Sequence, residues 1–147
     1  MRTGASQRTC GESALCGDTF ETFRDGRGRQ ILLISDGMGD GWAGRRGCRD
    51  GERPVFKACK IGLGFDTALR IVNSALLAKS EEESFATLDL ACFDFYTGAC
   101  TVCKAGAAAS FLRRAGKAEL LERASMPAGI LRKPGLPIFK QSFSREI

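Results

Sequence analysis

Residues 19–36 have the sequence pattern of a β-hairpin that leads into an acidic, glycine-rich loop. Residues 19–24 alternate as a half-buried strand does, residues 25–28 (DGRG) are a turn signal, and residues 31–34 (ILLI) are typical of a buried strand. Two strands joined by a tight turn pair in antiparallel fashion. The chain is therefore expected to build an antiparallel sheet and to place residues 35–41 (SDGMGDG) at one rim of it.

Residues 66–78 give the strongest helical pattern in the chain. Asp66 or Thr67 is placed to cap the helix N-terminus. The apolar residues recur at helical spacing and form one stripe, made of Ala68, Leu69, Val72, Ala75 and Leu76. This stripe is expected to pack on the sheet.

The second half of the chain reads as short strands separated by turns. A long buried strand is expected at 85–96, a turn at 97–98, a strand at 99–104, and a strand pair at 110–114 and 118–123. Residues 126–130 are expected to be a loop that enters a new strand. The sum is an α+β fold with mostly antiparallel strands.

Composition favours an ordinary globular domain, because 44% of the residues are hydrophobic and 27% are charged. No apolar run reaches the roughly 18 residues that a membrane span needs, and no secretory signal is visible. We therefore expect a cytoplasmic chain with reduced cysteines and no membrane contact of its own. The net charge of +5 resides largely in segments 42–59 and 132–147, so no basic face for nucleic acid is expected.

Asp18 and Asp36 are the candidate metal ligands. Each carboxylate stands beside a glycine where a predicted strand begins or ends, so hairpin pairing would bring the two together. Carboxylates and a nearby backbone carbonyl suit Mg²⁺ or Mn²⁺, which prefer oxygen ligands. The alternative is that each Asp-Gly pair marks a turn and nothing more.

Two further patterns are weaker. The glycines between residues 37 and 44 superficially suit a dinucleotide-binding loop, but Asp36 and Asp40 would repel phosphate and no helical period follows. Cys100 and Cys103 form a CxxC pair, yet the chain has no histidine and no second pair to complete a zinc site. We expect two ordinary thiols there, and no stabilisation by a nucleotide.

Asp89 and Asp94 lie inside the predicted strand at 85–96. A carboxylate within a buried strand needs hydrogen-bond partners. We expect both to be structural rather than metal-binding.

Four blocks together resemble the PPM-type (PP2C-like) serine/threonine phosphatase domain of the stage II sporulation protein E family. They are CGDTFETFRDGRGRQILLISDGMGDG, GFDTALRIVNSALLAKSEEESFATLDLACFDFYTG, KAGAAASFLRR and MPAGIL. The likeness covers roughly residues 12–41 and 61–131, and the blocks occur in the family's order. It implies an antiparallel β-sandwich flanked by helices, with a two-metal site at one end.

The resemblance also implies an activity, the hydrolysis of phosphoserine on an anti-anti-sigma factor in sporulation control. Mn²⁺ or Mg²⁺ would serve the reaction. By carry-over, Asp18 and Asp36 are catalytic metal ligands and Gly37 offers its backbone carbonyl, while Gly129 shapes the site. The full-length family protein is membrane-anchored upstream of this domain.

Two departures from the family set the expectations for this chain. The family's further metal-ligand aspartates lie downstream of residue 147, so the chain reads as a single partial domain over 1–147 with weak or no turnover. Segments 42–59 and 132–147 do not resemble the family, and 42–59 shows little helical period. The alternative function is a non-catalytic binding module that docks a regulatory protein.

The same two segments suggest a frameshift. With suitable codons, residues 42–59 read from the second nucleotide yield the family's missing amphipathic helix, and residues 132–147 read from the third yield a strand and turn. The hypothesis is therefore a frameshifted gene, a pseudogene product or a sequence with base-call errors, and the alternative is a genuine lineage-specific insertion and tail. Made as written, the domain is expected to expose apolar sheet surface and to be marginally stable.

Overall fold

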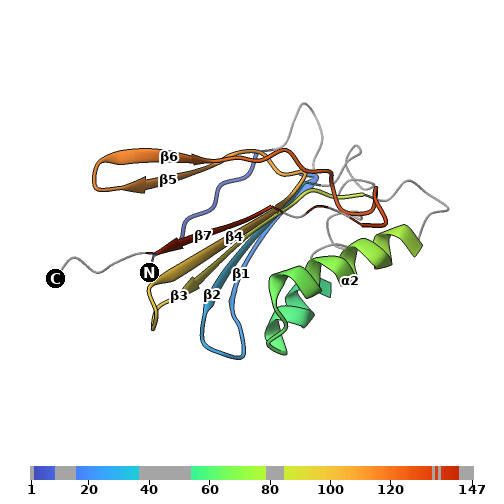
Figure 1. Cartoon of the computed structure of the whole chain (residues 1–147), viewed down its shortest axis with the longest axis horizontal. Helices are drawn as coiled ribbons and strands as arrows, with labels where there is room; N and C mark the ends of the chain where they lie inside the picture. Colours follow the sequence, from blue (N-terminus) through green and yellow to red (C-terminus); the bar gives the residue numbers. More distant parts are fainter. Residues whose placement is uncertain are drawn as a thin grey trace.

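The computed structural model describes residues 2–8, 16–36, 54–78, 85–133, 135 and 137–142. Five antiparallel strands form the main sheet in the order β1-β2-β3-β4-β7. Their bounds are β1 (Asp18–Arg24), β2 (Gln30–Asp36), β3 (Leu88–Asp94), β4 (Ala99–Ala105) and β7 (Ile138–Ser142). A two-stranded sheet, β5 (Ser110–Arg114) with β6 (Lys117–Leu121), lies over one face, and helix α2 (Phe65–Ala78) covers the other (Figure 1). The predicted α+β sandwich of antiparallel sheets and helices is confirmed.

The first hairpin forms as its sequence predicts, because Asp25 organises the turn. Its carboxylate accepts the backbone N–H groups of Arg27 and Arg29, each at 2.9 Å, and pairs with the Arg29 guanidinium at 2.6 Å. Gly28 adopts a φ of 77°, which a residue with a Cβ rarely takes. The turn fixes the register in which the two strands pair.

Strand β3 is shorter than the predicted strand at 85–96. It ends at Asp94 because the carboxylate there accepts the N–H groups of Tyr96 and Thr97, at 2.9 and 3.2 Å, and so starts a turn. At its other end, Ala86 makes an isolated bridge with Ala128. The strands predicted at 99–104 and around residues 115–116 are confirmed as β4 and the β5–β6 pair.

Helix α2 confirms the predicted helix at 66–78, with two local corrections. It starts at Phe65, and the carbonyl of Gly64 accepts the first helical N–H, so neither expected cap is in place. Asp66 instead binds Arg70 at 2.8 Å. Of the predicted stripe, Ala75 is exposed, and Asn73 is buried in its stead.

The expectation of little helical structure in segment 42–59 is wrong for its last residues. Residues 54–60 are helical, and Val55, Ala58 and Cys59 are buried with α2 against the main sheet. A helix this short spans too few turns to show a period, and packing rather than propensity stabilises it. This part of the segment covers the sheet instead of exposing it, while residues 42–53 lie outside the described residues.

The prediction that the loop at 126–130 enters a new strand directly is wrong. The next strand is β7, which lies in the segment 132–147 and pairs with the outer edge of β4. Arg114 of β5 donates to the carbonyl of Ser142 at 2.7 Å. The tail therefore extends the main sheet.

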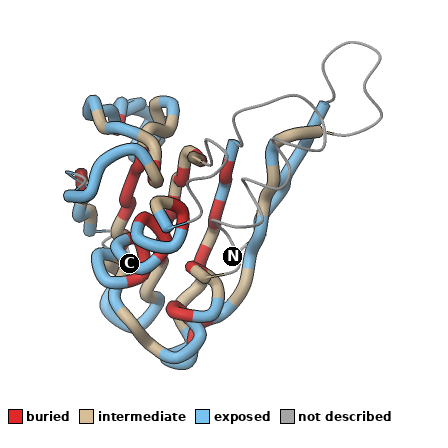
Figure 2. Tube along the Cα trace, turned by 90° about the vertical axis from the view of Figure 1, so that its right-hand side faces the viewer, coloured by how far each residue is buried: buried red, intermediate tan, exposed pale blue. Residues whose placement is uncertain are grey.

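Each face of the main sheet carries its own core, and buried positions concentrate in the central strands and on one side of α2 (Figure 2). We call the α2 side the helix face and the β5–β6 side the cleft face. The helix-face core includes Leu33, Leu69, Val72, Leu88 and Leu90. The smaller core on the cleft face joins Cys100, Val102 and Leu121.

In the described part of the chain, no helix has the length and apolar character needed to cross a membrane.

Candidate metal site at the open end of the first hairpin

Asp18 and Asp36 are direct partners in the antiparallel pairing of β1 with β2. They occupy the end of the hairpin opposite the Asp25 turn. Side chains alternate along a strand, so Asp36 lies on the same face as Ile34, the cleft face. The structure thus brings the two predicted carboxylates together, while Gly37 lies outside the described residues.

The pair is electrostatically unfavourable without a cation. Loss of surrounding water first, and then the negative charge and hydrogen bonding of Asp18, raise the pKa of Asp36 above its ordinary value. Both residues remain exposed at the strand ends, so the loss of water is partial. A divalent cation placed between the carboxylates would relieve their repulsion.

Thr87 and Ser35 hold the backbone at Asp36. The Thr87 hydroxyl accepts the Asp36 N–H at 3.0 Å, and the Ser35 hydroxyl donates to the Thr87 carbonyl at 2.9 Å. Sequence reasoning missed Thr87, because a threonine before a strand is unremarkable until its partner 51 residues away is known. Gly129, predicted to shape the site, has a φ of 97° and belongs to the loop bridged to residue 86.

The donor set suits a hard cation in kind, since two carboxylates supply the oxygen atoms that Mg²⁺ and Mn²⁺ prefer. In number it is incomplete. Across the described ranges, no group of three or more His, Cys, Asp or Glu side chains could hold a metal ion. Asp18 and Asp36 would therefore bind a cation from one side, with water on its other side.

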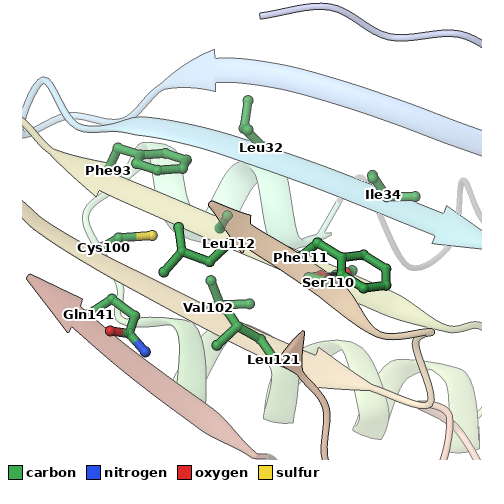
Figure 3. A pocket seen from close by; sticks show the side chains of 12 residues that line it. Leu32, Ile34, Phe93, Cys100, Val102, Ser110, Phe111, Leu112, Leu121 and Gln141 are labelled. Carbon is green, nitrogen blue, oxygen red and sulfur yellow. Dashed lines mark hydrogen bonds between the residues drawn. The ribbon is translucent and has the colours of Figure 1, made fainter. Parts of the chain in front are cut away.

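An apolar cleft lies between the two sheets, next to the acidic pair on the same face. Its volume is about 210 Å³, and it is lined mainly by apolar side chains of β2, β3, β4, β5 and β6, including Leu32, Phe93, Val102 and Leu112 (Figure 3). Polar residues Asp89, Ser110 and Gln141 also line it.

Asp89 and Asp94 have the hydrogen-bond partners expected of carboxylates within a buried strand. Asp89 binds the buried Lys104 at 2.6 Å, and Asp94 caps the β3–β4 turn, so both are structural. Cys100 and Cys103 are free and buried on opposite faces of the sheet. Burial raises the pKa of each thiol to about 11, which leaves them protonated at neutral pH.

Comparison with known proteins identifies the family. The family model described as "Stage II sporulation protein E (SpoIIE)" matches residues 26–145. Stage II sporulation protein E of Bacillus subtilis is 27% identical over 131 residues, which cover 89% of this chain and 16% of that protein. This chain thus spans only a small part of that relative's length.

Two solved structures share the fold. The PP2C phosphatase domain of SpoIIE from Bacillus subtilis, with a fragment of its regulatory domain, matches with a TM-score of 0.80 and 24% identity, over 91% of this chain and 40% of that one. RsbX in complex with magnesium matches with a TM-score of 0.73 and 18% identity, over 90% of this chain and 63% of that one. Because the family model covers most of the sequence, the chain belongs to the stage II sporulation protein E family.

Proposed function

We propose that this chain is part of a metal-dependent protein serine/threonine phosphatase, with Asp18, Asp36 and the Gly37 carbonyl as metal ligands. The observation that carries the proposal is the direct pairing of Asp18 with Asp36 in a chain of this family. The likeness to RsbX, whose structure holds magnesium, supports a divalent cation in the same fold.

The substrate in this proposal is a phosphorylated anti-anti-sigma factor. Hydrolysis of its phosphoserine by water gives the free serine hydroxyl and inorganic phosphate. Mn²⁺ or Mg²⁺, when bound, activates water and neutralises charge on the phosphoryl oxygens. The chain's own contribution is to hold two exposed carboxylates at the same end of the β1–β2 hairpin, where an incoming phosphoserine on a protein surface can reach them. Since the described residues supply only two carboxylates, we expect slow turnover at most.

The test is Mn²⁺-dependent release of phosphate from a serine-phosphorylated anti-anti-sigma factor by the full chain. Slow release that requires Mn²⁺ and disappears in Asp36→Asn is the expected result. Release that persists in Asp36→Asn, or without any divalent cation, would contradict the assigned site. A kcat in the range of about 1–10³ s⁻¹ usual for enzymes would contradict the expected slow turnover.

One observation favours a second candidate function, a non-catalytic binding module. The described residues bring together two carboxylates and no third metal-binding side chain. A module of this kind would bind the same phosphorylated protein without releasing phosphate. Binding measured by calorimetry, together with no Mn²⁺-dependent release, would favour it over the phosphatase.

A further inference from the structure

Thr87 makes three hydrogen bonds at the point where β2 delivers Asp36. Its hydroxyl accepts the Asp36 N–H at 3.0 Å, its own N–H donates to the Asp36 carbonyl at 3.0 Å, and its carbonyl accepts the Ser35 hydroxyl at 2.9 Å. Two of these bonds therefore fix both backbone polar groups of Asp36.

The pattern departs from an ordinary antiparallel ladder. A hydrogen-bonded pair of residues normally exchanges two backbone bonds. Here the Thr87 carbonyl accepts the Ser35 hydroxyl. The Asp36 N–H therefore donates to the side-chain hydroxyl of Thr87 instead of to the Thr87 carbonyl. The backbone N–H of this carboxylate-bearing residue consequently depends on one hydroxyl group, while its carbonyl accepts the backbone N–H of Thr87.

A second set of hydrogen bonds holds the residue that precedes Thr87. Ala86 and Ala128 exchange backbone bonds of 3.1 and 2.9 Å, which tie the residue before Thr87 to the 128–131 loop. Asn73 of α2, only 2% exposed, accepts the Gly129 N–H at 2.9 Å and donates to the Leu131 carbonyl at 2.8 Å. A continuous series of hydrogen bonds thus runs from the buried face of α2 to Asp36.

From this geometry we propose that Thr87 is a positioning residue that holds Asp36 opposite Asp18 for cation binding, with Asn73 as the anchor behind it. The inference rests on the proposed function, because it assumes that the two aspartates bind the metal. A residue that orients a ligand contributes to metal affinity without touching the metal, and its loss typically costs about 10–100-fold in affinity.

A purely structural role for Thr87 predicts a different outcome. Removing its hydroxyl would then lower the stability of the domain and leave the metal affinity of the folded chain unchanged. Mn²⁺ affinity, measured by titration calorimetry under conditions where the chain is folded, separates the two roles. Hydrogen exchange of the Asp36 amide, measured by NMR, reports directly on the bond that is removed.

Three variants of the full chain make the comparison. Thr87→Val keeps the branched shape and removes the acceptor, Thr87→Ser restores the hydroxyl, and Val72→Ala destabilises the helix-face core away from the site. We expect Thr87→Val to weaken Mn²⁺ binding at least about tenfold and to speed exchange of the Asp36 amide. We expect Thr87→Ser and Val72→Ala to bind Mn²⁺ like the original chain.

The other possible outcomes would overturn the proposal or a part of it. If Thr87→Val binds Mn²⁺ as tightly as the original chain, the positioning role is wrong. If Val72→Ala weakens binding as much as Thr87→Val, the effect is one of general stability and the role is again wrong. If the original chain is folded and binds no Mn²⁺, the proposed metal site falls, and the inference that rests on it falls with it. Asn73→Ala should also weaken binding, and unchanged affinity there would remove Asn73 from the series.

Discussion

Lys104 carries a charge that is fully buried between the two sheets, and its removal should be costly. Its ammonium donates to the Asp89 carboxylate at 2.6 Å, the Ala108 carbonyl at 2.6 Å and the Ser110 hydroxyl at 2.7 Å. All three donors of the ammonium are thereby satisfied. The Lys104 ammonium thus links β3, β4 and the start of β5, and it connects the small sheet to the main sheet.

Lys104→Met keeps most of the side-chain volume and leaves the Asp89 carboxylate without its counter-charge. Breaking a buried ion pair by removing one partner costs about 3–5 kcal/mol of the free energy of unfolding. The Asp89 side chain is 19% exposed and keeps a 2.8 Å bond from Ser110, so we expect the lower end, about 3 kcal/mol. Asp89→Leu instead leaves the Lys104 ammonium without its counter-charge at 0% side-chain exposure. We expect this variant to lose about 5 kcal/mol of the free energy of unfolding, the upper end of the range.

Urea denaturation followed by circular dichroism at pH 7 gives these differences. Lys117→Met is the matched control, because Lys117 is exposed on β6 and its replacement should change stability by no more than about 0.5 kcal/mol. The double variant Lys104→Met with Asp89→Leu should lose much less than the sum of the single variants, because it removes both charges and leaves neither one unpaired. A loss below about 1 kcal/mol for Lys104→Met, or additive losses in the double variant, would refute this reasoning.

Three further predictions follow from particular contacts. Burial alone would raise the pKa of Asp25, but hydrogen bonds from Arg29 and from backbone N–H groups outweigh it and lower the pKa. Asp25→Asn should therefore lower the free energy of unfolding by about 1.5–3 kcal/mol at pH 7. The difference in stability between the variant and the original chain should disappear as the pH falls below about 4, which urea titrations across that range would measure. Gly106→Ala would place a Cβ 2.6 Å from the Pro127 ring nitrogen at a φ of 65°, so thermal melts should show a loss greater than about 1 kcal/mol, and an unchanged Tm would contradict the close contact. Burial raises the pKa of Cys103 to about 11, so its stabilising contribution should be lost between pH about 9 and 11, and a thiol reagent at pH 8 should label it only after unfolding.

The parts of the fold that local pattern determines could be predicted from the sequence. The Asp25 turn, the α2 helix and the strands around residues 97–98 and 115–116 all depend on contacts between near neighbours in the chain. The pairing of Asp18 with Asp36 follows from the same turn, since a hairpin's turn fixes its register. This is why the two candidate ligands could be named before the fold was known.

The missed features depend on partners far away in the chain. Asn73 lies on a helix position that periodicity left out, and it is buried because it bonds to a loop more than 50 residues later. Lys104 would be expected at the surface, and only its three acceptors make its burial tolerable. The helix at residues 54–60 forms where tertiary packing outweighs weak local preference.

The frameshift hypothesis for segments 42–59 and 132–147 stays a prediction. Part of each segment packs into the structure, as Val55, Ala58 and Cys59 in the helix-face core and as β7 on the sheet edge. Sequencing of the genomic DNA from codon 36 to several hundred bases past codon 147 tests it. Shifted frames that encode the family's helix and a further SDG block would support it, and a confirmed written frame would favour a genuine insertion and tail.

Mn²⁺ binding to the full chain, compared with Asp18→Asn and Asp36→Asn, tests the central claim most directly. Titration calorimetry at neutral pH gives the affinity, and circular dichroism confirms that each variant is folded. We expect weak binding by the original chain, because only two carboxylates of the described residues meet at the site, and loss of binding in both variants. Binding that survives in either variant, or no binding by a folded original chain, would contradict the assignment of Asp18 and Asp36 as metal ligands.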